Sequence, residues 1–339
     1  MVPTPSRRKV PLLLPLVAIL LGIGVALWMT RTRPSEPQAN TESPRPEGSV
    51  VPPSQLAGLR YLPADTNIAF ALQPGGVLAY AARTNQDPRE LILKAGIPAK
   101  VLDSLTALGL TLQQIDSLVG GTSVANGAFE IRLTLVLTLR TPIADEEEFL
   151  RRLKAKNQPG AKGRHDVEFA GLAFTLARVS ATVWVFAFDS KKDLDSLDKD
   201  YSVGGKQFPQ PLADMIAQQV PPEAAAWIAT NDERWAEKPG VKLVVEMGMK
   251  KPELLPTLSK GRAGMASLSF GDTPRLRLLV KATSNANGQQ VRNYFAERAA
   301  SDAKIQHGGE GESAFFDAPI DPATAFATLQ KFLSDTTKK

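Results

Sequence analysis

The hydrophobic pattern of the chain begins with one long uncharged run. Residues 10–29 include no charged side chain, basic residues precede the run at 7–9, and Arg31 and Arg33 follow it. As an α-helix the run would extend about 30 Å, the thickness of the hydrocarbon core of a bilayer. We therefore predict a transmembrane helix over residues 10–29. A cleaved signal peptide is the alternative, with small residues for a cleavage site at 24–26.

The basic residues beside this run predict its orientation. Cytoplasmic flanks carry the excess of Lys and Arg, and the flank at residues 1–9, with the α-amino group, is the more basic one. We expect a short cytoplasmic segment over residues 1–9, too short for a signalling output domain. The rest of the chain then lies outside the cell membrane, in the periplasm if the source is bacterial.

Small residues recur every four positions along the predicted membrane helix. Ala18, Gly22 and Ala26 would let two such helices approach closely. Weak homodimerisation through this stripe is one interpretation. The other is that small residues are simply frequent in membrane helices.

Residues 30–58 show neither helical nor strand periodicity. The segment is polar and contains the prolines at positions 34, 37, 44, 46, 52 and 53. Repeated proline removes backbone donors, and a polar segment has little apolar surface to bury. We predict a disordered linker over residues 30–58.

Two later stretches repeat one succession of patterns. Similar openings stand at 62–71 and 220–229, and each leads to an apolar strand and then a helix, at 131–140 with 142–153 and at 276–282 with 289–298. When the first stretch is moved by 145 positions along the sequence, Ile131 aligns with Leu276 and Phe149 with Tyr294. The two openings instead align when the first is moved by 158 positions. We interpret this as duplication, with chance similarity as the alternative. The expected class is α+β, mostly antiparallel, with related sheet-and-helix domains at 59–200 and 220–339 joined by a linker and helix at 201–219.

The remaining periodicity predicts further elements. Helices are expected at 87–95, 99–108, 112–119, 191–199, 211–219, 252–260 and 321–334. Strands are expected at 167–169, 172–178, 182–188 and 264–270. The glycine pairs at 120–122 and 204–206 are interpreted as turns.

Charge and cysteine content narrow the function classes. The formal charge is +5, but residues 1–33 hold five basic and no acidic side chains, so the rest of the chain is neutral. The basic balance therefore reflects membrane topology, and no nucleic-acid partner is expected. The chain has no cysteine, which excludes disulfides, thiolate catalysis, Cys-ligated metals and a lipid-modified cysteine.

Few residues suggest chemistry. His165 and His307 are the two histidines; strand alternation separates His165 from its acidic neighbours, and the glycine-rich segment after His307 is interpreted as a turn between a helix and a strand rather than a metal site. The acidic run 145–148 opens a predicted helix, where negative side chains complement the helix dipole. Trp184, Trp227 and Trp235 are groove candidates, the first two in predicted strands where core packing is usual.

No strong catalytic motif stands in the sequence. The G-x-S-x-G and H-E-x-x-H motifs and the glycine-rich phosphate loops are absent. We therefore assign no catalytic, cofactor-binding or metal-binding residues and expect no cofactor.

The overall layout and the opening Leu-Pro-Ala-Asp at 62–65 resemble a family of uncharacterised bacterial membrane-anchored proteins. Their repeated α+β domains begin with a strand of this type, and the resemblance implies no known active site. We expect a membrane-anchored, extracytoplasmic protein of non-catalytic binding or scaffold type, with the bilayer and a protein or envelope component as partners. The alternative is an envelope hydrolase with a polar site in a cleft between the two halves.

Overall fold

The computed structural model describes residues 49–94, 99–124, 131–158, 163–169, 172–188, 208–231, 260–299 and 304–321. The predicted membrane helix, its small-residue stripe, Trp235 and the glycines at 204–205 lie outside these residues. So do the expected helices at 191–199, at 252–260 apart from Lys260, and at 321–334 apart from Asp321. Among the residues that are described, none of the helices has the length and apolar character needed to cross a bilayer.

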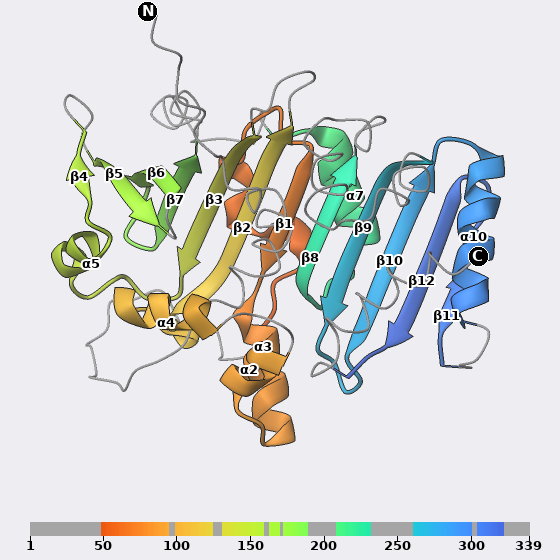
Figure 1. Cartoon of the computed structure of the whole chain (residues 1–339), viewed down its shortest axis with the longest axis horizontal. Coiled ribbons are helices and arrows are strands. Elements are labelled where there is room, and N and C mark those ends of the chain that lie inside the picture. The colour runs from red at the N-terminus through yellow and green to blue at the C-terminus, as the bar shows by residue number, and fades with distance from the viewer. Residues whose placement is uncertain are drawn as a thin grey trace, which may run out of the picture.

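Twelve antiparallel strands form one continuous sheet, in the order β11-β12-β10-β9-β8-β1-β2-β3-β7-β6-β5-β4 (Figure 1). The strands are β1 (Ile68–Leu72), β2 (Ile115–Val124), β3 (Ile131–Leu139), β4 (Lys156–Asn157), β5 (Arg164–Phe169), β6 (Leu172–Arg178), β7 (Val183–Phe188), β8 (Ala224–Asn231), β9 (Gly261–Ser269), β10 (Arg275–Ala282), β11 (Gln306–Gly308) and β12 (Ser313–Pro319). The expected α+β class with antiparallel strands is confirmed.

Six α-helices and three short 3₁₀ helices accompany the sheet in the described part of the chain. They are α2 (Pro74–Thr84), α3 (Pro88–Lys94), α4 (Ala99–Leu108), α5 (Glu146–Arg152), α7 (Gln210–Gln219), α10 (Asn285–Ala299), η2 (Pro53–Gln55), η3 (Ala57–Tyr61) and η4 (Leu112–Gln114). Figure 1 shows α5 near one end of the sheet and α10 at the other.

The first half, β1 to β7, and the second half, β8 to β12, meet through the β1–β8 pair. Phe70 lies directly opposite Ile228, and these residues are equivalent under the shift of 158 that matches the two openings. A pseudo-two-fold axis therefore passes through this pair, and each half extends outward from it. The halves were expected to form separate sheets in tandem; main-chain hydrogen bonds between β1 and β8 instead make them one sheet.

One face of the sheet, which we call the α5 face, carries aromatic packing at both ends. Near one end, the Phe149 ring of α5 meets the buried Trp184 of β7 edge-on, at 5.2 Å between ring centroids. Near the other, Phe295 of α10 packs on Phe316 of β12 at 5.7 Å. Phe149 and Phe295 are both buried, so the helices of the two halves serve the same purpose.

The opposite face, which we call the α7 face, is covered in two different ways. In the first half, η3 lies on β2 and β3, and a Cβ at Gly58 would be 2.7 Å from the Val119 side chain. In the second half, α7 packs on β8 and on η2, with Met215 buried in the same cluster as Trp227. The two halves are thus covered on this face by different elements, a short 3₁₀ segment in the first and an α-helix in the second.

The predicted disordered linker extends too far toward the first strand. Residues 49–58 are described, η2 begins at Pro53, and Leu56 is 4% exposed. Gln73 holds this segment, because its amide accepts a hydrogen bond from Val51 N (2.6 Å) and donates one to Val51 O (2.8 Å). Burial of Leu56 and these two bonds order a segment whose prolines had suggested disorder.

The helix expected at 112–119 and the turn expected at 120–122 are both wrong. A capping box between Thr111 and Gln114 limits the helix to the single turn η4, and β2 follows. Gly120 lies in the middle of β2, opposite Phe70. A glycine is required at this position because a Cβ there would overlap the Phe70 ring. The glycine is thus needed for close packing between neighbouring strands rather than for a turn.

Several expected elements are confirmed with the same or nearly the same bounds. They are α4, β6 and α7, together with β3, β7, β9 and β10. Helix α2 was not expected from the sequence. It begins with Pro74 in its first turn and includes Gly75 and Gly76, which lower helix propensity. A Cβ at Gly76 would be 2.5 Å from the Ala225 side chain, so the glycine lets α2 lie against β8.

Candidate functional site

His165 lies in β5, the second strand from one end of the sheet. Its strand neighbour Asp166 accepts a hydrogen bond from Gln158 Nε2 at 2.5 Å, on the other face of the strand. Val167, two residues after His165, is buried in the core. The alternation predicted for this segment is confirmed, and it directs the imidazole and the neighbouring carboxylate to opposite faces.

His307 lies in β11, the edge strand at the opposite end of the sheet. The glycine-rich segment after it forms the β11–β12 turn, with φ values of 126° at Gly309 and 55° at Gly311. Arg292 of α10 donates to Gly311 O (2.7 Å) and Ser313 O (2.9 Å). The segment is thus a turn held against α10, although it joins two strands rather than a helix and a strand.

The strand order separates the two histidines by most of the width of the sheet. Within the described ranges, His, Asp and Glu side chains form no group of three or more suited to a metal ion. These histidines therefore do not form one site together.

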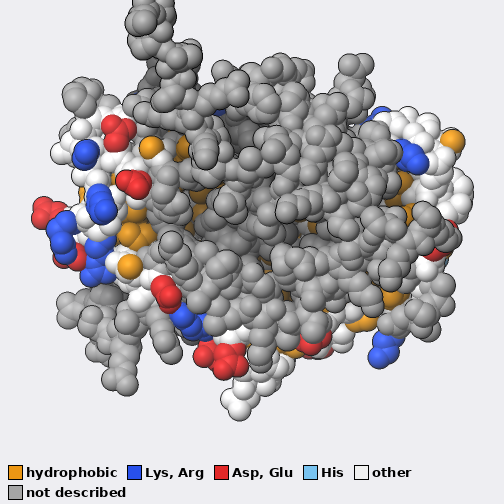
Figure 2. Space-filling model, in the orientation of Figure 1, with side chains coloured by type: hydrophobic (Ala, Val, Ile, Leu, Met, Phe, Trp, Pro, Cys, Tyr) orange, Lys and Arg blue, Asp and Glu red, His pale blue; other side chains and the backbone are white. Residues whose placement is uncertain are grey.

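The acidic run at 145–148 begins and stabilises α5. Asp145 is the N-cap and accepts a hydrogen bond from Glu148 N at 2.9 Å. Glu148 accepts from Arg151 (2.6 and 2.7 Å) and from Arg152 (2.6 Å). The hydrogen bonds from Arg151, and after them the one from Arg152, lower the pKa of Glu148 from 4.5 to about 2. Figure 2 shows acidic and basic side chains side by side at the end of the sheet that carries α5.

This lowered pKa predicts a pH-dependent stability. A carboxylate whose pKa is lower in the folded state stabilises the fold above the unfolded pKa of about 4.3 and loses this effect as the pH falls through its folded pKa. We expect Glu148→Gln to reduce the free energy of unfolding slightly at pH 7, and the difference from the unmodified chain to vanish near pH 2. Urea titrations of both proteins at several pH values measure this difference.

The neighbouring Glu147 provides the matched control. It is an exposed carboxylate in the same helical turn and forms no ion pair with a described residue. Glu147→Gln should leave the free energy of unfolding nearly unchanged across the same pH range. If Glu148→Gln gave an equally flat profile, the assigned pKa shift would be wrong.

Two of the three tryptophans considered as groove residues are core residues. Trp184 is fully buried and Trp227 is 2% exposed. The expectation of core packing for both is confirmed. Trp227 nevertheless has a second property, because its indole Nε1 is buried and no described residue accepts a hydrogen bond from it.

A row of polar side chains crosses the α7 face of the second half. Trp227 of β8 lies opposite Ser267 of β9, which lies opposite Arg277 of β10, which in turn lies opposite Asp317 of β12. Three buried atoms of this row have no hydrogen-bond partner among the described residues: Trp227 Nε1, Ser267 Oγ and Arg277 Nε. Ser267 is 3% exposed and Arg277 is half-buried. We call Trp227, Ser267 and Arg277 the donor row.

The equivalent row in the first half has a different composition. The pseudo-two-fold relates Ala69 to Trp227, and the ladders then relate Gly121 to Ser267 and Thr134 to Arg277. Between β3 and β10 the ladders thus give a shift of 143 rather than the 145 expected from the sequence. Leu62, fully buried, covers this row, and its methyl groups would be 3.0 Å from a Cβ at Gly121. The first row offers a single unpartnered side-chain atom, Thr134 Oγ1. The same place in the fold is thus mainly apolar in one half and polar in the other.

Next to the donor row, β10 carries basic side chains at alternate positions on the α7 face. These are Arg275, Arg277 and Lys281, which we call the β10 basic strip. Arg275 Nε pairs with Asp317 at 2.7 Å. Arg277 and Lys281 form no ion pair with any residue of the described ranges. The strip therefore keeps two positive charges that the described structure does not neutralise.

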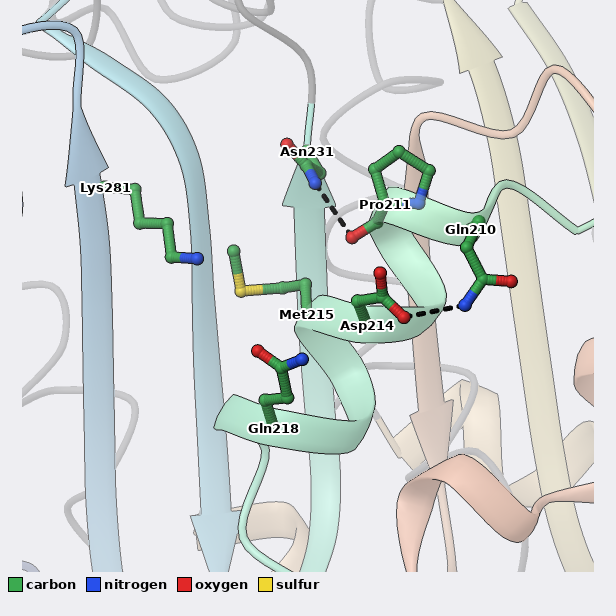
Figure 3. A pocket seen from close by; sticks show the side chains of 7 residues that line it. All are labelled: Gln210, Pro211, Asp214, Met215, Gln218, Asn231 and Lys281. Atoms are coloured by element: carbon green, nitrogen blue, oxygen red, sulfur yellow. Dashed lines mark hydrogen bonds between the residues drawn. The ribbon is translucent and has the colours of Figure 1, made fainter.

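A pocket of about 350 Å³ lies between α7 and the Lys281 end of the strip. Its lining residues are Gln210, Pro211, Asp214, Met215, Gln218, Asn231 and Lys281. In Figure 3 the Lys281 side chain extends from β10 toward Met215 of α7. Asn231 Nδ2 donates to Pro211 O (2.8 Å) and Gln210 Nε2 to Asp214 Oδ1 (2.7 Å). These bonds fix one side of the pocket.

One pattern in the sequence indicates this site, although we used it above only to predict a strand. In the β10 segment, basic residues occupy positions 275, 277 and 281, and the positions between them are mostly apolar. This alternation predicts a strand with basic side chains on one face. Comparison of the chain with family models, curated proteins and solved structures gives no match.

Proposed function

We propose that the chain is a membrane-anchored extracytoplasmic protein that acts by binding a partner rather than by catalysis. One observation carries this proposal: the donor row and its neighbouring pocket are present in the second half, whereas the equivalent place in the first half is closed by Leu62 over Ala69 and Gly121. The fold can therefore be built without these polar groups. The membrane anchor itself is the proposal drawn above from residues 10–29.

The energetic cost of the donor row supports a binding role. Burying a polar group without a hydrogen-bond partner costs about 1–3 kcal/mol. The donor row lowers the stability of the second half, whereas the equivalent positions of the first half are mostly small or apolar. We infer that such costly side chains are present because they make contacts with another molecule. A binding partner that supplies acceptors can recover this cost at the half-buried guanidinium of Arg277, but not at Trp227 or Ser267, which are 2% and 3% exposed.

The proposed alternative, a hydrolase with a polar site between the halves, fits the geometry less well. The halves meet at β1 and β8, whose facing residues include Ala69, Phe70, Ile228 and Ala229. These apolar side chains offer neither a nucleophile nor a general base. The hydroxyl in this ladder, that of Thr230, donates to Asn67 O at 2.9 Å. We therefore place the functional surface beside α7.

Photo-crosslinking in the native membrane tests the proposed function. A photoreactive residue at Gln218, which is exposed at the rim of the pocket, should capture the same protein in repeated experiments on the full-length chain. The control position is Val179, exposed near the other end of the sheet, which should capture nothing in common with Gln218. If Gln218 captures no reproducible protein, the proposed function is wrong.

A further inference from the structure

The chemistry of the α7 face of the second half identifies the kind of partner. We infer that the β10 basic strip and the pocket at its Lys281 end bind an acidic segment of a polypeptide. This inference rests on the proposed function and specifies the surface and the ligand chemistry. Residues of α7 form one side of the site, and β10 forms the other.

The positive charges that lack an acidic partner in the described structure indicate that the ligand is negatively charged. Asp317 already pairs with Arg275, which leaves Arg277 and Lys281 without an acidic partner in the described part of the chain. Arg277 also has its Nε buried without an acceptor. A half-buried guanidinium is held at a cost in solvation, and a carboxylate that reaches it offsets this cost with charge-assisted hydrogen bonds.

The donor row gives the hydrogen-bonding type of the ligand. An indole N–H, a guanidinium and an ammonium group can only donate hydrogen bonds, and a hydroxyl can donate as well as accept. Arg277 and Lys281, which are half-buried, therefore require acceptors that a ligand can supply, whereas Trp227 is 2% exposed and lies beneath the surface. A ligand rich in carboxylate and carbonyl oxygens supplies them.

The spacing of the charges favours an extended ligand over a small anion. Arg277 and Lys281 lie four residues apart on one strand, which corresponds to about 13 Å. One carboxylate cannot reach both, whereas acidic side chains along an extended segment can. The recess between α7 and β10 admits the part of such a segment that reaches Lys281, and Gln218 at its rim can bond to peptide groups. A flat bilayer surface does not enter a recess of this kind.

Asp214 opposes the binding of an acidic segment. Its side chain lines the pocket across from Lys281 and is exposed, with one carboxylate oxygen accepting from Gln210. A second negative charge in the pocket would be repelled by it. Neutralising Asp214 should therefore strengthen binding, which is the opposite of the effect of neutralising Lys281.

The test measures binding of a fluorescent deca-glutamate peptide to the full-length chain in detergent by anisotropy. Arg277→Gln with Lys281→Gln should weaken binding at least about tenfold, as expected for two charge-assisted contacts. Asp214→Asn should strengthen it about twofold or more. The matched control, Lys154→Gln with Lys156→Gln, removes two positive charges from exposed positions in the first half and should change binding less than twofold.

Competition identifies the source of the negative charge. Unlabelled deca-glutamate should displace the labelled peptide, whereas deca-glutamine, inorganic phosphate and vesicles containing phosphatidylglycerol should not do so at equal charge concentration. Displacement by phosphate or by the vesicles at the same concentration would overturn the inference, and so would an equal loss of binding in the control variant.

Two safeguards keep the result interpretable. Tryptophan fluorescence shows whether each variant is folded, and Lys281→Gln alone replaces the double variant if Arg277→Gln unfolds the chain. The photo-crosslinking at Gln218 is read separately. Capture of a partner that is unchanged by Arg277→Gln and Lys281→Gln would leave the proposed function standing and overturn the acidic-segment inference.

Discussion

Replacing Gly120 with valine is expected to lower the free energy of unfolding by about 3 kcal/mol or more. A Cβ at this position alone would overlap the ring of Phe70, which is 1% exposed and lies opposite Gly120 in the β1–β2 ladder. Phe70 also pairs with Ile228 across the junction of the two halves. The added side chain would therefore disturb the pairing at the centre of the sheet.

Urea unfolding followed by tryptophan fluorescence measures this effect, since Trp184 and Trp227 are both buried. The matched control is Gly271→Val, because a Cβ at Gly271 meets nothing within 4 Å, and it should change stability little. Adding Phe70→Ala to Gly120→Val should destabilise less than the sum of the two single changes, because the smaller side chain removes the overlap. Strict additivity would show that Gly120 and Phe70 do not meet as described.

Replacing Trp184 with alanine is expected to lower the free energy of unfolding by about 3–5 kcal/mol. Trp184 is fully buried and meets the Phe149 ring edge-on at 5.2 Å between ring centroids. Alanine would leave a cavity between β7 and α5 and remove the support of that helix. The measurement is the midpoint and slope of urea unfolding, with Phe149 unchanged.

Trp184→Phe is the control for this change. Phenylalanine keeps most of the apolar volume and lacks the indole Nε1, which is buried without a partner. We therefore expect Trp184→Phe to cost clearly less than Trp184→Ala. Equal losses for the two variants would contradict the packing role assigned to the ring.

Local patterns in the sequence predicted most individual elements of the fold. The alternation at 131–140 predicted β3, and the apolar spacing at 99–108 predicted α4, with bounds that match the structure closely. The prediction was wrong at 112–119 because a short apolar run fits a helix or a strand equally well. The Phe70 ring decides between them, because it requires a glycine opposite it, and Phe70 lies 50 residues before Gly120 in the chain.

The candidate site could not be predicted from the sequence in the same way. Its donor row takes one residue from each of three strands, Trp227, Ser267 and Arg277. Their side chains meet because of ladder register, which depends on tertiary pairing rather than on local pattern. The two repeated openings did indicate which residues pair at the junction, because the shift of 158 makes Phe70 equivalent to Ile228, and these two residues lie opposite each other in the sheet. The joining of both halves into one sheet follows from a pairing that periodicity does not report.

The position of the donor row depends on the register between β1 and β8, which disulfide formation tests most directly. The chain has no cysteine, so an engineered pair reports without background. Ala69 lies opposite Ala229, and cysteines at directly opposite strand positions are close enough to form a disulfide. The account predicts that Ala69→Cys with Ala229→Cys crosslinks under mild oxidation, while Ala69→Cys with Ala225→Cys, about 13 Å out of register, stays reduced. Crosslinking of the second pair and not the first would contradict the shared sheet and the site built on it.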